Sequence, residues 1–327
     1  MILRHVLILV LALAVSACAA VTHPAGPATQ APRLEDDRLV MADGAVLPLR
    51  AWRPGGQPQA VLLALHGMND YSNFFAAPGA HLAAKGILSY AYDQRGFGAG
   101  PHPGQWSSTQ SMVDDARAAL DLLALRHPGL PVYLFGESMG GAVAILVATD
   151  PPAGLDGIIL AAPAVWGRAA MPWWQRLSLW LAYQLAPGWT PSGQGLNIRP
   201  SDNIEMLRKL GADPLVIKQT RIDAIKGVVD LMDAAQAAPA AMRTPVLFLY
   251  GAHDQIIPSD PTWAAAAVMP DRRAGFYANG WHMLVRDLQA DVVLDDMAAW
   301  MADADAALPS GADSAAPQLP EVCSCSR

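Results

Sequence analysis

The sequence predicts an α/β fold with a mostly parallel central sheet and helices on both faces of the sheet. Short runs of apolar residues alternate along the chain with stretches of helix-forming residues. Runs that are apolar throughout indicate strands buried on both faces, and parallel sheets of this kind are covered by helices on each side. The expected strands span residues 38–41, 45–52, 60–65, 87–92, 131–135, 157–162, 246–250 and 274–277.

Composition favours one large domain and excludes one class of partner. The 327 residues include 53% hydrophobic and 16% charged side chains, which is ample apolar material for a single core. The formal net charge is -7, and the chain has no block of Lys or Arg. Because contacts with nucleic-acid phosphates need clustered cations, we exclude nucleic acid as a partner. The sequence leaves the oligomeric state open.

Residues 1–18 have the pattern of an export signal. A short cationic start precedes an apolar run that is too short for a comfortable membrane span. The stretch Val15-Ser16-Ala17-Cys18 resembles the lipobox of bacterial lipoproteins, which implies that Cys18 becomes the lipidated first residue of the mature chain. Ala19 in the next position implies the periplasmic side of the outer membrane. Ordinary cleavage after Ala19 and an uncleaved anchor helix are the two alternatives.

Two segments flank the expected domain, which spans residues 38–303. Residues 19–37 are rich in Pro, Ala, Thr and Gly, and we expect them to form a flexible tether. Residues 304–327 lack apolar periodicity and are expected to be disordered. Cys323 and Cys325 in this tail are too close together to close a stabilising loop. No other His or Cys group has metal-ligand spacing, so we expect no metal site.

Residues 164–238 interrupt the alternation of strands and helices, and we expect them to form an inserted helical cap. The run 172–185 is apolar over most of a helical circumference. Such a helix must bury more than one face, against protein, substrate or membrane. We expect Trp166, Trp173 and Trp174 to line an apolar substrate site, although packing of the cap onto the body is an equally simple role for any one of them.

Residues 136–140 read Gly-Glu-Ser-Met-Gly between an expected strand and an expected helix. Glycines on both flanks permit a sharp strand-to-helix turn that exposes Ser138 at the sheet edge. The helix N-terminus behind the serine favours developing negative charge. The pattern therefore indicates a nucleophilic serine, and a glycine-rich turn with an incidental serine is the alternative.

A nucleophilic serine needs a base within hydrogen-bond reach and a carboxylate that orients the base. Asp254 follows the expected strand at 246–250, and His282 follows the one at 274–277. Serine, then aspartate, then histidine, each in a loop after a strand, is the chain order of α/β hydrolases. We therefore expect Ser138, Asp254 and His282 to form a catalytic triad, with His253 as the rival base.

The oxyanion of such a reaction needs two backbone N–H donors. The Met139 amide follows the nucleophile directly, and the Met68 amide lies in the loop after the strand at 60–65. A plain turn at His66-Gly67 is the alternative for that loop. Other polar residues are expected in structural, surface or helix-capping roles: His66, His102, His127, Asp260 and Asp287.

These motifs together carry a resemblance to a known family. They read H-G-M-N-D, Y-D-Q-R-G-F-G, G-E-S-M-G-G, L-A-A-P-A, G-A-H-D-Q-I-I-P and W-H-M-L over residues 61–284. The chain resembles the monoacylglycerol lipase and lysophospholipase branch of the α/β hydrolases, which is grouped with serine-aminopeptidase-like proteins. The resemblance implies an ester hydrolase for single-chain lipids, without a cofactor, and with a mobile apolar cap. It also implies a structural role for Arg95.

The expected partners are a lipid ester substrate and, through the anchor, a membrane. Two other functions compete with ester hydrolysis. A peptidase or amidase of the same fold uses the same triad, but the apolar cap favours lipid esters. A non-catalytic envelope lipoprotein predicts a missing triad member, whereas all three members are present.

Overall fold

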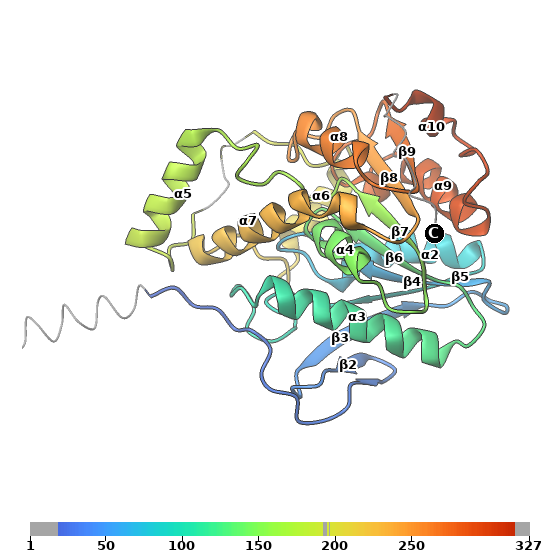
Figure 1. Ribbon diagram of the computed structural model, residues 1–327, viewed down its shortest axis with the longest axis horizontal. Coiled ribbons are helices and arrows are strands. Elements are labelled where there is room, and N and C mark those ends of the chain that lie inside the picture. The colour runs from blue at the N-terminus through green and yellow to red at the C-terminus, as the bar shows by residue number, and fades with distance from the viewer. Residues whose placement is uncertain (1–18, 192–194, 196, 318–327) are drawn as a thin grey trace, which may run out of the picture.

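The computed structural model describes residues 19–191, 195 and 197–317, and within them a nine-stranded sheet carries helices on both faces (Figure 1). The strand order is β1-β2-β3-β5-β4-β6-β7-β8-β9. The pairs β1–β2, β2–β3 and β3–β5 are antiparallel, and the remaining neighbours, from β5 to β9, are parallel. The strands are β1 (Arg33–Leu34), β2 (Arg38–Val40), β3 (Val46–Trp52), β4 (Ala60–Leu65), β5 (Ile87–Tyr92), β6 (Val132–Glu137), β7 (Leu155–Ala161), β8 (Val246–Gly251) and β9 (Arg272–Tyr277). The predicted α/β class is confirmed, and the predicted strands are present with ends that shift by at most two residues.

The helices divide between the two faces of the sheet. They are α2 (Ala76–Ala84), α3 (Thr109–Arg126), α4 (Met139–Thr149), α5 (Trp173–Leu185), α6 (Ile204–Ala212), α7 (Ile222–Ala237), α8 (Ser259–Ala267), α9 (Ala290–Ala302) and α10 (Ala312–Ala315), with short 3-10 helices η1 (Ser72–Phe75), η2 (Pro239–Ala241) and η3 (Leu284–Arg286). One buried cluster joins the sheet to α3, α4, α7 and α8. A second cluster joins the other face to α2, α9 and α10.

Alternation along β4 shows how one apolar strand serves both clusters. Val61, Leu63 and Leu65 belong to the first cluster, and Ala60, Leu62 and Ala64 belong to the second. Successive side chains of a strand point to opposite faces, so a run that is apolar throughout fills two cores at once. This is the physical basis on which the sequence predicted a covered parallel sheet.

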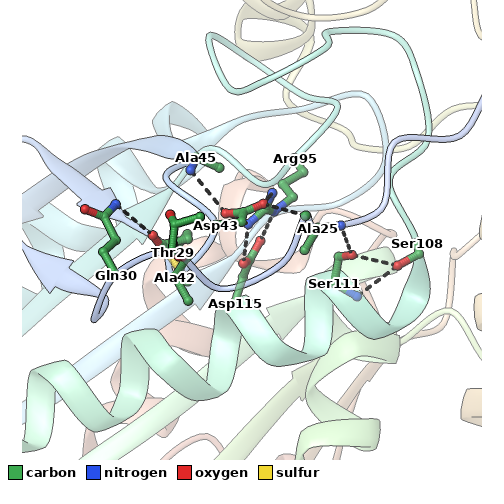
Figure 2. A network of polar contacts seen from close by, with 12 residues as sticks. Ala25, Thr29, Gln30, Ala42, Asp43, Ala45, Arg95, Ser108, Ser111 and Asp115 are labelled. Carbon is green, nitrogen blue, oxygen red and sulfur yellow. Dashed lines mark hydrogen bonds and ion pairs between the residues drawn. The ribbon is translucent and has the colours of Figure 1, made fainter.

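The structure corrects the expectation that residues 19–37 form a flexible tether. This segment, the N-terminal strap, lies along the body in extended form, and β1 adds its end to the sheet. The Ala25 N–H donates to Ser111 Oγ (2.7 Å), and the Gly26 N–H donates to Asp43 Oδ2 (3.0 Å). Figure 2 shows the strap crossing α3 at Ser111. Backbone N–H groups of the strap donate to side chains from other parts of the chain. The local composition of residues 19–37 does not reveal these contacts.

The C-terminal segment is also more ordered than expected, as far as residue 317. Leu308 is buried, and α10 packs against β9. Arg273 of β9 pairs with Asp313 at 2.9 Å, and the Ser310 N–H donates to Asp296 Oδ1 at 3.0 Å. The prediction of disorder is therefore wrong for residues 304–317. Cys323 and Cys325 lie outside the described residues, and so do the leader and Cys18.

The cap segment at 164–238 contains helices of two kinds. α5 and α6 bury no residue completely, and Figure 1 shows α5 standing apart from the sheet. α7 is different because its buried face packs on α3 and α4 and belongs to the larger core cluster. Gly227 of α7 lies so close to the Trp106 ring that a Cβ there would approach it to 2.4 Å. We therefore count α7 as a helix of the body.

Candidate active site

Ser138 occupies a strained turn between β6 and α4. Its backbone has φ 53° and ψ -114°, a conformation that is costly for a residue with a Cβ and that recurs at functional sites. The residue is half-buried, and Met139 begins α4 immediately after it. The serine is thus presented at the carboxyl end of the parallel sheet, where ligand sites of open α/β sheets occur.

Two glycines make this turn possible. A Cβ on Gly136 would come within 2.4 Å of the Gly140 carbonyl oxygen, and a Cβ on Gly140 would come within 2.3 Å of the Leu65 carbonyl oxygen. Both distances are shorter than any real Cβ contact, so only glycine fits at either position. The sequence predicted glycine on both sides of the serine because the turn is sharp. The backbone contacts at Gly136 and Gly140 confirm this explanation.

His282 and Asp254 meet in the loops after β9 and β8. His282 Nδ1 lies 2.8 Å from Asp254 Oδ2, and neither side chain is accessible beyond 4%. The other carboxylate oxygen, Asp254 Oδ1, accepts hydrogen bonds from the Ile256 N–H (2.7 Å) and the Ile257 N–H (3.0 Å). Because the Asp254 carboxylate accepts a hydrogen bond from Nδ1–H, the neutral ring carries its proton on Nδ1. Nε2 is then free to act as a base. His253, the rival base, is exposed to solvent.

The environment of His282 raises its pKa. Burial is the largest single influence and disfavours the imidazolium, but the charge and hydrogen bond of Asp254, together with the Glu137 charge, outweigh it. The net pKa lies above the ordinary value of 6.5. A base of this strength is well suited to accept a proton from a serine hydroxyl.

Hydrogen bonds and ion pairs join the loops that carry the three residues. The His253 N–H donates to the Gly280 carbonyl oxygen at 2.8 Å, which ties the aspartate loop to the histidine loop. Arg286 extends from the histidine loop to Glu137, the residue before Ser138, at 2.5 Å. Within the described residues no hydrogen bond joins Ser138 Oγ to His282, so the function of the serine stays a prediction.

Arg286 is the centre of a buried ion-pair cluster that sequence reasoning missed. Its guanidinium contacts Glu137 at 2.5 Å and Asp70 at 2.7 Å, and all three side chains are buried. Burial favours the uncharged guanidine, yet the two carboxylates keep the pKa of Arg286 above its usual value. The cluster links the loop after β4, the end of β6 and η3, which follows β9. The sequence did contain a signal for this cluster, because positions 70 and 137 are charged although the motifs around them are mostly apolar.

The loop after β4 lies beside the nucleophile, as the oxyanion-hole prediction requires. A Cβ on Gly67 would lie 3.4 Å from Ser138 Cβ. His66 holds this loop, because its Nδ1–H donates to the Gly67 carbonyl oxygen (2.8 Å) and its Nε2 accepts from the Gln94 N–H (3.1 Å). Burial lowers the pKa of His66, which keeps the ring neutral for both contacts. Met68 and Met139 therefore flank the serine, and donation by their amides remains a prediction.

Segments of the cap rest directly on the predicted catalytic loops. The Ile217 N–H donates to the Asn69 carbonyl oxygen at 3.0 Å, beside Met68. On the histidine side, Ser201 Oγ donates to Asp287 Oδ1 at 2.6 Å, and the Trp281 N–H donates to Asp287 Oδ2 at 2.7 Å. Burial raises the pKa of Asp287 to about 6. Asp287 is therefore not the surface residue that we expected, since it connects the cap to the loop of His282.

The structure separates the three tryptophans that were expected to line a substrate site. Trp166 is partly buried against the core, close to the end of β7. Trp173 and Trp174 begin α5 and are 68% and 54% exposed. In this conformation they face solvent, because α5 contacts the body through its opposite side. Their contact with substrate stays a prediction.

Other polar residues have the structural roles that were expected. Arg95 is buried between Asp43 and Asp115, with contacts of 2.7 and 2.6 Å (Figure 2), and it holds the pKa of Asp43 well below its usual range. His127 Nε2 lies 3.0 Å from the Tyr90 hydroxyl, His102 stacks on His23, and Asp260 lies in the first turn of α8.

A groove of about 610 Å³ includes Arg286 in its lining. Residues of α6, η1, α2 and α9 line it, together with Asp70, Arg286 and Asp287, whereas Ser138 and His282 do not. The described residues contain no group of three or more His, Cys, Asp or Glu side chains placed to hold a metal ion. None of the described helices has the length and apolarity needed to cross a membrane.

Comparison with known proteins identifies the family. The family model described as "Serine aminopeptidase, S33" matches residues 56–289, which include β4 to β9 and every loop described above. The chain belongs to this family. The S33 match also places Ser138, Asp254 and His282 within one homologous unit.

Curated relatives of this S33 protein include two lipases. Human monoglyceride lipase is 28% identical over 261 residues, which cover 76% of this chain and 84% of the human protein. Monoacylglycerol lipase of Mycolicibacterium smegmatis is 25% identical over 258 residues, or 76% of this chain and 90% of the relative.

Solved structures agree on the fold. A soluble variant of monoglyceride lipase from Saccharomyces cerevisiae, crystallised with a substrate analogue, has a TM-score of 0.70 at 19% identity and covers 86% of this chain and 98% of its own. Monoacylglycerol lipase from Paleococcus ferrophilus has a TM-score of 0.63 at 22% identity, over 78% of this chain and 98% of its own. At these identities the likeness establishes the α/β-hydrolase fold.

Proposed function

We propose that the protein is a serine ester hydrolase that cleaves monoacylglycerols and related single-chain lipid esters such as lysophospholipids. One observation carries the proposal: a buried His282–Asp254 pair of 2.8 Å lies at the same sheet edge as the strained turn of Ser138. The similarity to monoglyceride lipases over three quarters of the chain supports the class of substrate.

In the proposed mechanism, Ser138 Oγ attacks the ester carbonyl carbon while His282 Nε2 takes the hydroxyl proton. Asp254 stabilises the imidazolium, and the amides of Met68 and Met139 donate to the oxyanion, each worth about 10²- to 10³-fold in rate. The imidazolium then protonates the departing alcohol, which leaves an acyl-enzyme. Water attacks the acyl-enzyme by the same proton transfers and releases the fatty acid.

The charges of α7 favour ester over peptide substrates. An aminopeptidase requires a free carboxylate near the site to bind the substrate ammonium group. The acidic side chains of α7 that face the cap are already paired: Asp223 with Arg221, Asp230 with Lys226 and Asp233 with Arg168. Binding of an amine there would break an existing ion pair, which disfavours the peptidase alternative.

Substitution of the nucleophile tests this proposal. Ser138→Ala should fold normally and lower turnover of monoacylglycerol by about 10⁴- to 10⁶-fold, because attack and proton transfer are both lost. Ser259→Ala, an exposed serine at the start of α8, is the matched control and should retain full turnover. A panel of monoacylglycerols, lysophospholipids and aminoacyl anilides determines the substrate class. Parent-like turnover by Ser138→Ala, or faster cleavage of the anilides, would reject the proposal.

We also propose that the chain is attached to the bacterial cell envelope through a lipid on Cys18, on the periplasmic side of the outer membrane. The lipobox-like sequence at residues 15–18 supports this assignment. An enzyme for lipid esters benefits from such an anchor, because the anchor holds it at the surface where its substrate is dissolved.

A further inference from the structure

Asp287 closes the loop that carries His282. The Trp281 N–H donates to Asp287 Oδ2 at 2.7 Å, so one hydrogen bond joins the two ends of the 281–287 loop. Trp281 is the residue directly before His282. The carboxylate therefore holds the backbone at the point where it enters the predicted base, although Asp287 lies five residues further along the chain.

The cap holds the same carboxylate from its other side. Ser201 Oγ donates to Asp287 Oδ1 at 2.6 Å, and the Asn203 N–H donates to Ser201 Oγ at 3.1 Å. Ser201 is completely buried, and Asp287 is 3% exposed. Each oxygen of the carboxylate thus accepts a hydrogen bond from the protein. Because solvent has almost no access, a lost donor would leave a buried charge with an unsatisfied acceptor.

The backbone that leaves His282 is also held by the cap. The Met283 N–H donates to the Pro200 carbonyl oxygen at 3.0 Å. Met283 directly follows His282, so hydrogen bonds hold the amide groups before and after the predicted base. Pro200 and Ser201 are neighbours in the sequence. One short segment of the cap therefore contacts the loop of the base directly at one point and through Asp287 at the other.

The charge of Asp287 is retained at a cost to stability. Burial raises the pKa of Asp287 to about 6, although the hydrogen bonds from Ser201 and Trp281 oppose this rise; the charges of Asp202 and Glu137 add to it. The folded protein therefore binds this proton more tightly than the unfolded chain does, and ionisation at neutral pH lowers the free energy of unfolding. A costly carboxylate beside a predicted catalytic residue indicates a role in function.

We propose that Asp287 is a positioning residue for His282: it acts through the Trp281 amide, and Ser201 of the cap keeps its carboxylate in place. The inference rests on the proposed function and deepens it, because it names the contacts through which the cap acts on the base. A displaced 281–287 loop would disturb the contact of His282 with Asp254, and a misplacement of about 1 Å lowers rates by about 10²-fold.

Two substitutions of Asp287 separate its hydrogen bonds from its charge. Asp287→Ala removes both acceptors. Asp287→Asn removes the charge, but its amide oxygen can accept from the Trp281 N–H and its amide nitrogen can donate to Ser201 Oγ. The proposed role depends on the acceptor for Trp281, so asparagine should replace aspartate and alanine should not. A carboxylate that only stabilised the fold would affect the unfolding free energy and leave kcat of the folded enzyme unchanged.

Steady-state kinetics on a soluble ester tests this role. Asp287→Ala should lower kcat about 10- to 100-fold and change KM less than about twofold, whereas Asp287→Asn should keep kcat within about threefold of the parent. Asp43→Ala is the control, because Asp43 also accepts backbone N–H groups, from Gly26 and Ala45; it should leave kcat unchanged. Parent-like kcat in Asp287→Ala, a change in KM alone, or equal losses in both variants of Asp287 would overturn the proposal.

A substitution in the cap tests the other half of the proposal. Ser201→Ala removes one hydrogen bond to Asp287 and should lower kcat about three- to tenfold. S201A/D287A should lose no more than Asp287→Ala alone, because Ser201 acts through Asp287. Parent-like kcat in Ser201→Ala, or losses that add in the double variant, would overturn the role of the cap. Thermal unfolding verifies that each variant is folded, and Ser201→Ala decides the matter if Asp287→Ala does not fold.

Proton NMR separates this inference from the proposed function, because it needs no turnover. The His282 Nδ1–H, bonded to a carboxylate, gives a far-downfield resonance that is assigned by its absence from His282→Gln. We expect the resonance in the parent, Asp287→Asn and Asp43→Ala, and its loss or shift in Asp287→Ala. A parent without ester turnover whose resonance still depends on Asp287 would reject the proposed function and keep the positioning role. An active parent whose Asp287→Ala variant keeps both resonance and kcat would overturn the positioning role alone.

Discussion

The catalytic edge of the body and the α5 helix of the cap use apolar and charged residues in opposite ways. At the edge, charged side chains are buried and paired: Arg286 holds Asp70 and Glu137, and His282 contacts Asp254. On α5, tryptophans and leucines face solvent. Buried pairs fix loops in one geometry because separation would leave an uncompensated charge. Exposed apolar residues fix nothing within the chain, so their role depends on what they meet outside it.

The comparison teaches where stability and adaptability lie in this enzyme. The loops that carry Ser138, Asp254 and His282 are linked to one another by hydrogen bonds and ion pairs across the sheet edge. The cap rests on these loops through a few contacts at residues 201, 217 and 220. The cap therefore contacts these loops through hydrogen bonds, whereas buried ion pairs join the loops to one another.

After substitution of the nucleophile, the largest expected effect comes from the orienting carboxylate. Asp254→Asn should lower kcat by about 10³- to 10⁴-fold while the fold is retained, because an amide can donate to His282 and favour the wrong tautomer. Asp260→Asn, six residues later in an exposed position, is the control and should leave kcat unchanged. Steady-state kinetics on a soluble ester measures both. A loss of less than tenfold in Asp254→Asn would argue against the triad.

A pair of tryptophans tests the difference between body and cap directly. Trp300 of α9 is 3% exposed and Trp173 of α5 is 68% exposed. Trp300→Ala should lower the free energy of unfolding by about 3–5 kcal/mol through loss of packing, whereas Trp173→Ala should change it by less than about 0.5 kcal/mol. Urea unfolding measures both. Comparable losses in the two variants would mean that α5 packs on the body in solution.

The smallest expected effect is a shift in the pH dependence of kcat/KM. Only neutral His282 can act as a base, so kcat/KM should rise with pH and level off above an apparent pKa higher than 6.5. The raised pKa also means that the folded state binds this proton more tightly than the unfolded chain. Its stabilising effect is therefore complete below pH 6.5 and is lost as pH rises through the folded value.

A pH–rate profile measures this limb. Substitution of Trp180 by Ser in the cap should leave the apparent pKa unchanged, because no charge near His282 changes. A limb below pH 6.5, or one that moves in Trp180→Ser, would show that the charges assigned to the sheet edge do not control the base.

The sequence by itself determined the fold class, the strands and the order of the candidate catalytic residues. These features are local: an apolar run specifies a buried strand, and backbone crowding within the turn itself requires glycine at 136. The contact of His282 with Asp254 followed because loops after neighbouring parallel strands must meet at one edge.

Only the tertiary structure decided which contacts these segments make with distant parts of the chain. The N-terminal strap has the composition of a linker, yet its amide groups find Asp223, Ser111 and Asp43 across the fold. The Trp-rich run at 172–185 was expected to bury more than one face, and within the chain its tryptophans Trp173, Trp174 and Trp180 are exposed. The partners of Arg286 come from positions 70 and 137, which are 216 and 149 residues away. Such contacts depend on distances that close only when the whole chain has folded, so no local pattern contains them.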